Sequence, residues 1–369
     1  MITAPDGFSS LPAAIARELE TTRRVVVVLL DALGWAFVER HARHPLVARL
    51  ARDGLLAPMA SQFPSTTTAH VTTMHTGLPV EAHGLYEWRV WEPALGRVMV
   101  PLLVGADEER DGLDPRALLP EGPSFYQRLA VRAGVASVVF SPGRFSPSPY
   151  DGAAIRGARL VPYDDLLAGA RTLAETVAAA EDNVYAYLYF DGIDMTGHRH
   201  GPSSPEFDDA CLRGLDAIYV AFFGPEAPAL DDTTLIVTAD HGQVDVAAER
   251  VDLVDELVPS LAGMLTAPPA GSARDLFLHV GEDHVDAAMA ALGDALEGRA
   301  TVHRSGELFA TIGPRLAERL APVCVLPARG RMAWLSTHRD DIQLRFRGHH
   351  GGRTPEEATT FVGAIALGG

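Results

Sequence analysis

The chain has 369 residues, of which 47% are hydrophobic and 21% are charged. That composition supports a buried core and excludes an intrinsically disordered chain. The net charge of −17 argues against a protein that wraps a nucleic-acid polymer or binds an anionic membrane surface, because no basic stripe occurs in the sequence. All basic residues are arginines, so a positive side chain that contacts a substrate must be a guanidinium.

The length predicts two domains, or one large core with an insertion. The first 20 residues lack the basic start and apolar run of a signal peptide, and no later stretch is long and apolar enough to cross a bilayer. We therefore expect a cytoplasmic protein. Cys211 and Cys324 are then expected to be buried free thiols rather than a disulfide.

Runs of apolar and β-branched residues alternate with stretches of helical periodicity. The strand-like runs are residues 23–31, 135–141, 184–194 and 233–242. This alternation predicts an α/β fold with a doubly wound, mostly parallel sheet flanked by helices. Three of the runs contain an aspartate at or near their carboxyl end, namely Asp31, Asp194 and Asp240. Ligands bind beyond that edge in such sheets, although a single aspartate there can equally be a helix cap or a turn residue.

The pattern changes after residue 251, where turn-forming residues precede a short strand-like run and a helical run. We predict that residues 256–339 form an inserted, small α+β cap subdomain. Residues 1–255 and 340–369 would then form the catalytic core.

A run of hydroxyl residues, Ser65, Thr66, Thr67 and Thr68, follows Pro64 and opens a predicted helix over residues 67–75. The N-terminus of a helix favours an anion, and a hydroxyl in its first turn is suited to attack a phosphoryl group. Serine and threonine are also favoured helix caps, so the run alone leaves both interpretations open.

Carboxylates and imidazoles recur at spacings that suit a metal ion. Asp194 and His198 are four residues apart, Asp240 and His241 are adjacent, and His350 lies among glycines. Together with Asp31 they provide six oxygen and nitrogen ligands, enough for two divalent ions with Thr67 as a further ligand. These ligand types favour zinc without excluding manganese or iron. A single pair of this kind could instead belong to a solvated loop.

The ordered set of motifs resembles the alkaline phosphatase superfamily and, within it, the nucleotide pyrophosphatase/phosphodiesterase branch. The motifs, in chain order, are the strand-end Asp31, Pro-x-x-Thr (Pro64, Thr67), Thr-Gly-Leu (Thr76, Gly77, Leu78), Glu-x-His-Gly (Glu81, His83, Gly84), Asp-x-x-Gly-His-x-x-Gly-Pro (Asp194 to Pro202), Asp-His-Gly (Asp240 to Gly242) and Gly-x-His-Gly (Gly348 to Gly351).

The resemblance implies which residues hold each metal ion and which one attacks. One zinc ion would take Asp194, His198 and His350, and the other would take Asp31, Thr67, Asp240 and His241. Thr67 would be the nucleophile, because it lies three residues after Pro64 and ten before Gly77, the spacing of the family's threonine. The role of His70 stays open: it could donate a hydrogen bond to a phosphoryl oxygen or indicate a different substrate class.

The resemblance further implies hydrolysis of phosphodiester or pyrophosphate bonds in a small, nucleotide-like molecule, through a phospho-threonine intermediate. Phosphomonoester or phosphonate hydrolysis is the alternative within the superfamily, and a non-catalytic, metal-bound interaction module is the alternative of another class. Six further residues are candidate substrate contacts. The aromatic candidates for stacking a base are Tyr86, Trp88 and Trp91, and the candidates for contacting a phosphate are Arg89, Arg144 and Arg347.

Overall fold

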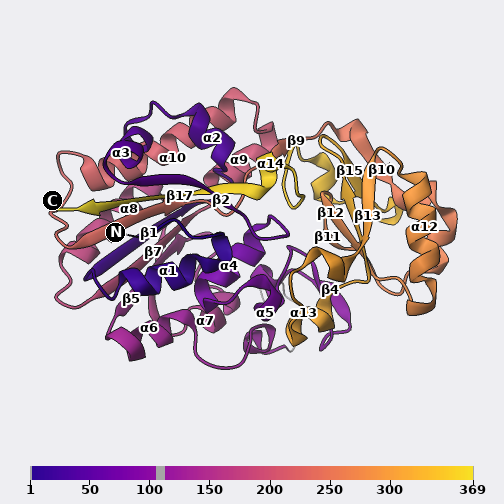
Figure 1. Ribbon diagram of the computed structural model, residues 1–369, viewed down its shortest axis with the longest axis horizontal. Coiled ribbons are helices and arrows are strands. Elements are labelled where there is room, and N and C mark those ends of the chain that lie inside the picture. Colours follow the sequence, from indigo (N-terminus) through magenta and orange to yellow (C-terminus); the bar gives the residue numbers. More distant parts are fainter. Residues whose placement is uncertain (1, 105–112, 369) are drawn as a thin grey trace.

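The structure is a computed structural model that describes residues 2–104 and 113–368. A seven-stranded sheet forms the centre of the larger lobe (Figure 1). Its strands, in sheet order, are β2 (Leu55–Ala60), β17 (Thr359–Leu367), β8 (Thr233–Thr238), β1 (Arg24–Leu30), β7 (Val184–Phe190), β5 (Ala136–Pro142) and β6 (Ala158–Tyr163).

The sheet is mostly parallel, as predicted. Strand β1 pairs in parallel with β7 and β8, and β5 pairs in parallel with β6 and β7. Strand β17 is the exception, because it returns from the chain end and runs antiparallel between β8 and β2. The carboxyl ends of β1, β7 and β8 therefore meet at one edge of the sheet.

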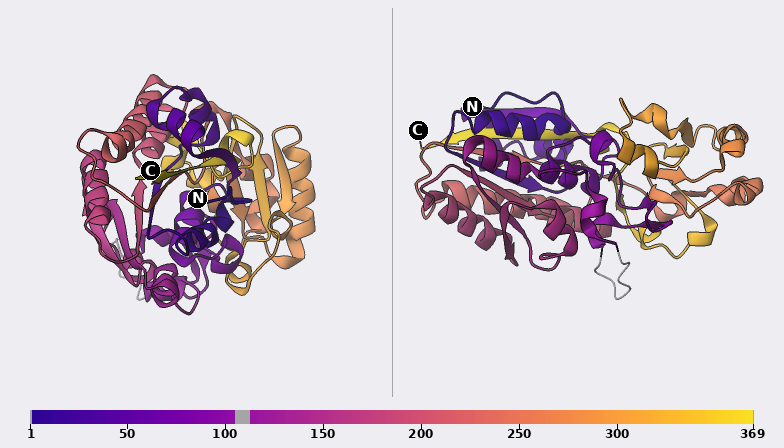
Figure 2. Two further views of the ribbon diagram at one scale, coloured as in Figure 1. Left: turned by 60° about the vertical axis from the view of Figure 1, so that its left-hand side comes forward. Right: turned by 90° about the horizontal axis from the view of Figure 1, so that it is seen from below.

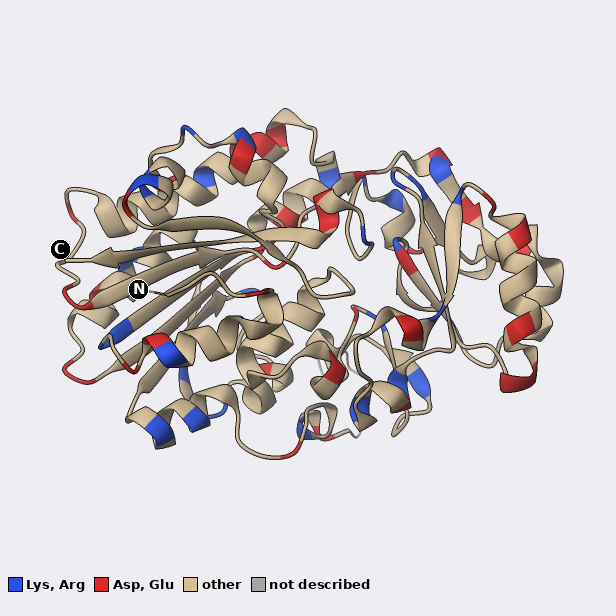
Figure 3. Ribbon diagram, viewed as in Figure 1, with Lys and Arg blue, Asp and Glu red and all other residues tan. Residues whose placement is uncertain are grey.

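Both faces of the sheet are buried, which explains why β1 is apolar throughout. Val25, Val27 and Leu29 pack in one hydrophobic cluster, and the alternating residues between them pack in another. The helices of the first cluster are α1 (Leu11–Glu18), α4 (Thr67–Thr76), α6 (Phe125–Ala133) and α7 (Pro149–Ala154). Those of the second are α2 (Trp35–Arg40), α3 (Pro45–Asp53), α8 (Leu166–Ala178), α9 (Gly192–His200) and α10 (Pro205–Phe223). Figure 2 shows these two helical layers with the sheet between them, and Figure 3 shows that charged residues lie mainly outside the sheet.

A smaller lobe lies beyond the carboxyl edge of the central sheet (Figure 1). Its four-stranded antiparallel sheet has the order β11 (Ala270–Ser272), β12 (Asp275–Leu278), β14 (Val323–Pro327) and β13 (Ala300–Arg304). One face of this sheet packs with helix α12 (Val285–Ala295). The other face contributes Phe277, Cys324 and Leu326 to the same cluster as helices α1 and α4. A continuous hydrophobic core therefore joins the two lobes.

The strand pairing of the smaller lobe begins slightly before residue 256, the predicted start of the cap. Strand β10 (Val251–Leu253) pairs with β15 (Met332–Trp334), and helix α11 (Val254–Leu257) follows directly. The hairpin of β3 (Val90–Glu92) and β4 (Arg97–Met99) also reaches this lobe, since Arg89 accepts a hydrogen bond from the Gly271 amide at 2.8 Å. Segments on both sides of the predicted boundary thus form the joint between the lobes.

Short elements complete that joint. They are α5 (Val80–His83), α13 (Pro314–Arg319), α14 (Pro355–Ala358), and the pair of β9 (Val244–Asp245) with β16 (Gly348–His349). Cys211 and Cys324 are buried free thiols, as expected. Within the described residues, no helix has the length and apolar character needed to cross a membrane.

Candidate metal centre and nucleophile

The predicted metal ligands meet where β1, β7 and β8 end. Asp31 directly follows β1, and Asp240 and His241 come shortly after β8. Asp194 differs from the sequence-based interpretation, because β7 ends at Phe190 and Asp194 lies in the first turn of α9. His198 is one helical turn further on, so both side chains project from one face of this helix.

Asp31, Asp240 and His241 form the first group. Their ligand atoms all lie within 4.8 Å of one another. The Nε2 atom of His241 is 3.4 Å from Asp31 Oδ1 and 3.4 Å from Asp240 Oδ2. Thr67 joins this group, since its Oγ1 is 3.3 Å from Asp31 Oδ2 and 3.4 Å from His241 Nε2. The four residues assigned to one ion by the resemblance are thus brought together.

Asp194, His241 and His350 form the second group, again with ligand atoms within 4.8 Å of one another. His350 Nε2 is 3.6 Å from Asp194 Oδ1, and His198 Nε2 is 3.2 Å from Asp194 Oδ2. The rings of His241 and His350 stack with their centroids 3.9 Å apart. His241 therefore lies between the two groups, whereas His198 reaches the second group through Asp194.

Hydrogen bonds fix the orientation of the three candidate histidine ligands. The Nδ1 atom of each ring lies against a backbone carbonyl, which can only accept, so Nδ1 carries the proton and Nε2 presents a lone pair. The carbonyls are those of Gly348 for His198 (2.8 Å), Gly242 for His241 (3.1 Å) and Ser65 for His350 (3.0 Å). With this tautomer all three Nε2 atoms present lone pairs toward the carboxylates, an arrangement that suits a cation between them.

Two carboxylate oxygens in the site support the same conclusion. Asp31 Oδ1 and Asp240 Oδ2 are buried and have no hydrogen-bond partner among the described residues. Burial and the neighbouring aspartates raise the pKa of Asp31 well above its usual value, and burial raises the pKa of Asp240 to about 7. Burial acts in the same direction on Asp194, but the neighbouring histidines His198, His350 and His241 together lower the pKa of that carboxyl. Carboxylate oxygens and imidazole nitrogens fit a divalent ion such as zinc.

Thr67 begins helix α4, and its position resolves which of the four hydroxyls faces the metal ligands. The preceding Thr66 has an extended backbone and its side chain does not cap the helix, so no side-chain oxygen of the cap residue occupies the first-turn N–H groups. Ser65 Oγ donates to the Gly352 carbonyl at 2.8 Å, away from Asp31 and His241. Of the run, Thr67 alone combines contact with the ligand group and a place in the first turn.

The segment before Thr67 is bound to the segment that carries His350. Ser65 and Gly351 form a backbone bridge, and the Gly351 amide donates to Ser65 Oγ at 3.1 Å. The Ser65 carbonyl in turn accepts from His350 Nδ1. Ser65 therefore orients a candidate metal ligand and holds the chain two positions before the candidate nucleophile.

His70 and His83 are structural in this arrangement. His70 is fully buried; its Nδ1 lies 2.7 Å from the Thr66 carbonyl, and its Nε2 accepts from the Gln62 amide at 2.9 Å. Both ring nitrogens are thus occupied, so the structure gives no support to a hydrogen bond from His70 to a phosphoryl oxygen. His83 Nδ1 accepts from the Leu85 amide at 3.1 Å, which holds the turn after α5.

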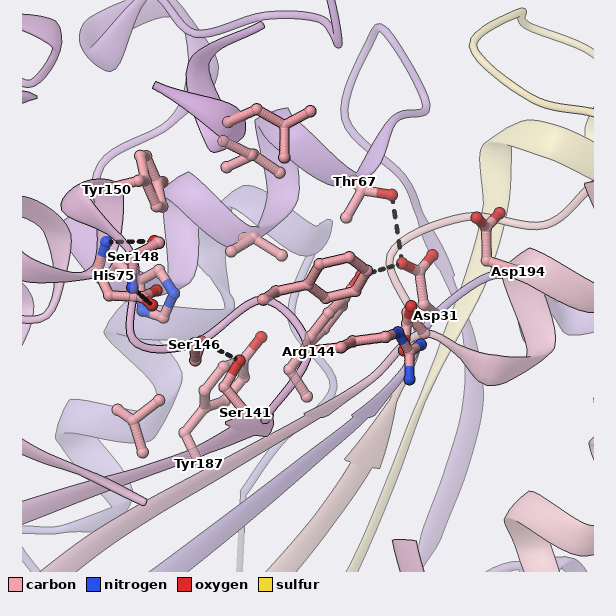
Figure 4. A pocket seen from close by; sticks show the side chains of 18 of the residues that line it. Asp31, Thr67, His75, Ser141, Arg144, Ser146, Ser148, Tyr150, Tyr187 and Asp194 are labelled. Carbon is pink, nitrogen blue, oxygen red and sulfur yellow. Dashed lines mark hydrogen bonds and ion pairs between the residues drawn. The ribbon is translucent and has the colours of Figure 1, made fainter. Parts of the chain in front are cut away.

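A cavity of about 250 Å³ opens beside Thr67, Asp31 and Asp194 (Figure 4). Most of its wall is apolar or aromatic, with hydroxyl groups placed between the apolar side chains. Its aromatic lining residues are Trp88, Phe145, Tyr150, Tyr187 and Tyr189, and its hydroxyl residues include Ser141, Ser146 and Ser148. A cavity of this kind can hold an organic group attached to the phosphorus that Thr67 would attack.

Two of the six candidate substrate contacts line the cavity, and the other four do not. Trp88 and Arg144 line it. Tyr86 is fully buried and packs against Phe277 with ring centroids 4.9 Å apart, so it belongs to the core. The remaining candidates are not lining residues: Trp91 packs against His279, Arg89 forms an ion pair with Asp341, and Arg347 borders a separate hollow with His200 and Asp245.

Three residues of the site were not found from the sequence. Tyr189 donates to Asp31 Oδ2, Gln243 donates to Asp194 Oδ1, and Asp191 forms an ion pair with Arg144. Tyr189 and Asp191 flank the end of β7, where the alternation of side chains along a strand offers a weak signal. Gln243 follows the Asp-His-Gly motif directly, and its contact with a residue 49 positions away gives no local pattern.

The doubly wound sheet, the acid and histidine groups at its carboxyl edge and the threonine at a helix start define the class of this protein. It is an α/β protein of the metal-dependent, alkaline phosphatase-like class. Comparison with known proteins gives the family. A model of the type I phosphodiesterase/nucleotide pyrophosphatase family matches residues 25–353, so the chain belongs to that family.

Individual relatives agree with this assignment. The chain is 28% identical over 244 residues to human ectonucleotide pyrophosphatase/phosphodiesterase family member 7, covering 63% of this chain and 50% of that protein. The chain thus spans about half the length of this curated relative.

Solved structures share the fold. Murine ectonucleotide pyrophosphatase/phosphodiesterase 5 matches with a TM-score of 0.68 at 21% identity, covering 93% of this chain and 88% of the other. An inactive threonine-to-alanine variant of the murine protein, in complex with AMP, matches with the same TM-score and identity over 93% and 87% of the two chains. The human counterpart matches at 0.69 and 18% identity, over 93% and 87%.

Proposed function

We propose that this chain hydrolyses phosphodiester or pyrophosphate bonds of small, nucleotide-like molecules, with Thr67 as the nucleophile. The observation that carries the proposal is the position of Thr67 Oγ1. It lies 3.3 Å from Asp31 Oδ2 and 3.4 Å from His241 Nε2, at the start of a helix and beside the cavity. Family membership supports the same reaction class.

Different residues of the chain attack phosphorus, bind the phosphoryl oxygens and orient the attacking group. Thr67 Oγ1 forms a bond to phosphorus, the bond from phosphorus to the leaving oxygen breaks, and water later cleaves the covalent threonine ester. Backbone N–H groups in the first turn of α4 are placed to bind a phosphoryl oxygen, because the cap side chain leaves them free. Tyr189, which donates to Asp31, orients the carboxylate that accepts from Thr67.

We further propose that two divalent ions, zinc in the first instance, are held by the two groups, one by Asp31, Thr67, Asp240 and His241, the other by Asp194, His198 and His350. When bound, such ions lower the pKa of a hydroxyl and neutralise charge on phosphoryl oxygens. The unpartnered oxygens of Asp31 and Asp240 and the outward lone pairs of the histidines support this assignment.

The cavity and the relatives support a nucleotide-like substrate. The murine relative was solved in complex with AMP, and Trp88 and the tyrosines that line the cavity here can pack against a flat ring. The complete set of ligands and the correctly placed hydroxyl argue against a non-catalytic module. A cytoplasmic location stays a prediction from the sequence.

The decisive experiment compares a bis-aryl phosphate with the matching mono-aryl phosphate, using the zinc-loaded protein. We expect faster turnover of the diester. Thr67→Ala should lower kcat by at least about 1,000-fold, since it removes the attacking atom, and Thr67→Ser should retain measurable turnover. Mass spectrometry of rapidly quenched protein should find the covalent adduct on the peptide that contains Thr67.

Two outcomes would contradict the proposal. Faster monoester turnover would replace the diesterase assignment with the phosphomonoesterase alternative. Full activity of Thr67→Ala would show that another group attacks phosphorus.

A further inference from the structure

The residues that line the cavity carry more negative than positive charge. Its described lining residues include four aspartates, of which Asp31 and Asp194 belong to the metal centre. Asp151 is committed to the start of α7, where its Oδ2 accepts from the Ser148 amide at 2.8 Å. Arg144 alone among these residues carries a permanent positive charge.

Asp191 holds Arg144 at the cavity wall. The guanidinium forms an ion pair with Asp191, whose side chain is only 6% exposed, and its Cζ lies 4.8 Å from the centre of the Phe145 ring. Asp191 precedes helix α9 but its side chain does not cap that helix, so this carboxylate is free to bind Arg144. A buried carboxylate on one side and an aromatic ring on the other restrict where the guanidinium can lie.

The rest of the guanidinium is available to a ligand. A guanidinium has five N–H donors, and among the described residues Asp191 is the one hydrogen-bond partner of Arg144. The side chain is 51% exposed, and Figure 4 shows it reaching along the cavity toward Asp31, which contacts Thr67. Its open side therefore belongs to the same cavity as Thr67, the cavity that would hold the substrate.

We infer that Arg144 binds a second anionic group of the substrate, carried next to the phosphorus that Thr67 attacks. This inference rests on the proposed function and narrows it. A guanidinium binds a phosphate or a carboxylate through paired N–H donors, whereas a neutral ester group offers no matching charge. Arg144 would thus favour substrates in which the reacting phosphoryl group has a charged neighbour, a pyrophosphate above all, over diesters with an uncharged aryl or alkyl group.

The test measures kcat/KM for two substrates with the same nucleoside: a dinucleoside pyrophosphate and the p-nitrophenyl ester of the nucleoside 5′-phosphate. Arg144→Gln should lower kcat/KM for the pyrophosphate by about 10- to 100-fold, the effect of losing one hydrogen bond between charged groups. The same variant should change the p-nitrophenyl ester by less than about threefold, and Arg144→Lys should recover part of the loss. Arg347→Gln is the matched control, because it removes an exposed arginine that borders a separate hollow.

A carboxylate could supply the second charge instead of a phosphate. Phosphonoacetate, in which a carboxylate lies next to the phosphorus, distinguishes these two anionic groups. If the wild-type protein hydrolyses phosphonoacetate and Arg144→Gln does not, the site binds a carboxylate. Equal losses on both nucleotide substrates, or no loss on either the pyrophosphate or phosphonoacetate, would overturn the inference.

A binding measurement separates this inference from the proposed function. A methylene-bridged ADP analogue should bind the Thr67→Ala protein more tightly than Thr67→Ala/Arg144→Gln by about 10- to 100-fold in calorimetry. That difference does not depend on turnover. If the wild-type protein hydrolysed none of the substrates but the two affinities differed, the proposed reaction would fail while the anion site would stand; equal affinities would overturn the anion site.

Discussion

At the residue scale, the histidines of this chain divide into two kinds that the sequence does not distinguish. His198, His241 and His350 place Nδ1 against a backbone carbonyl and leave Nε2 free toward carboxylates. His70 and His83 instead have both ring nitrogens occupied by neighbouring groups of the chain. A histidine with one free nitrogen can bind a ligand, and one with none can only support the structure.

The buried structural histidines make stability depend on pH. Burial lowers the pKa of His83 to about 3, so the folded protein keeps this ring neutral. An unfolded chain binds a proton there below pH 6.5, and stability is therefore lost as the pH falls from 6.5 toward 3. At pH 5 the loss is about 2 kcal/mol for each such residue. His70, His75 and His349 shift in the same direction, with pKa values of about 3.

His83→Gln tests this pH dependence. The variant should lower the free energy of unfolding at pH 7.5, because it disturbs the bond to the Leu85 amide, yet it should flatten the decline between pH 6.5 and pH 5. Urea unfolding at several pH values measures both effects. The exposed His284 provides the control, as His284→Gln should leave the slope unchanged. An unchanged slope in His83→Gln would show that His83 takes up protons equally in both states.

At the element scale, a buried ion pair connects the smaller lobe to the segment that carries His350. Arg274, in the turn between β11 and β12, forms an ion pair with Glu357 of α14 at 2.8 Å, and both side chains are fully buried. Glu357 also accepts from the Gly352 amide at 3.1 Å, two residues after His350. The position of the candidate metal ligand His350 thus depends on an element of the other lobe.

Arg274→Met should lower the free energy of unfolding by about 3–5 kcal/mol, because it leaves the Glu357 carboxylate buried without its partner. Chemical denaturation of the metal-free protein measures this loss. The double variant Arg274→Met/Glu357→Gln should recover part of it, since it removes the unpaired charge. A loss below about 1 kcal/mol would mean that water reaches Glu357 in the variant.

The element scale also shows what the sequence could predict. The β-branched run before Asp31 and the run before Asp240 are fully buried strands, and both were located correctly because continuous apolar runs are typical of a parallel sheet. Strands β2, β6 and β17 of the central sheet were missed. Strand β17 is inserted antiparallel between β8 and β2, a pairing that no local pattern specifies.

The candidate site, like the sheet, could be predicted only where neighbouring residues in the sequence carry the signal. The spacing of Asp194 and His198 suggested a shared ion, but residues 184–194 were predicted as one strand-like run that ends at Asp194. In the structure, β7 ends at Phe190 and α9 begins at Gly192. The glycine of the Asp-His-Gly motif has a steric reason: a Cβ on Gly242 would lie 2.1 Å from the Glu356 carbonyl oxygen. Contacts such as Arg144 with Asp191 join residues 47 positions apart, and only the folded chain brings them together.

At the scale of the whole molecule, the candidate metal centre is a cluster of buried carboxylates whose mutual repulsion a cation would relieve. Asp31 and Asp240 are buried beside each other and beside Asp194. Adding zinc to the metal-free protein should therefore raise Tm by several degrees, because an ion that binds the folded state alone stabilises it. Differential scanning calorimetry, with metal analysis by mass spectrometry, measures the shift and the number of ions bound.

The variant Asp240→Asn tests whether charge repulsion among these carboxylates lowers the stability of the metal-free protein. Asp240→Asn removes one charge from the cluster, so it should raise the Tm of the metal-free protein and reduce the further gain from zinc. We expect two ions per wild-type chain. Identical Tm values with and without zinc would contradict the assignment of these groups to a metal centre.

The bridge between Ser65 and Gly351 has a consequence for how opening of the site can be observed. The Gly351 amide is bonded to Ser65 Oγ, so it can exchange its hydrogen with solvent only when the segment before Thr67 separates from the segment after His350. A single backbone amide therefore reports whether the segments that carry the candidate nucleophile Thr67 and the candidate metal ligand His350 are joined. Deuterium uptake at Gly351, followed with and without zinc, would give the free energy of that local opening without any measurement of turnover.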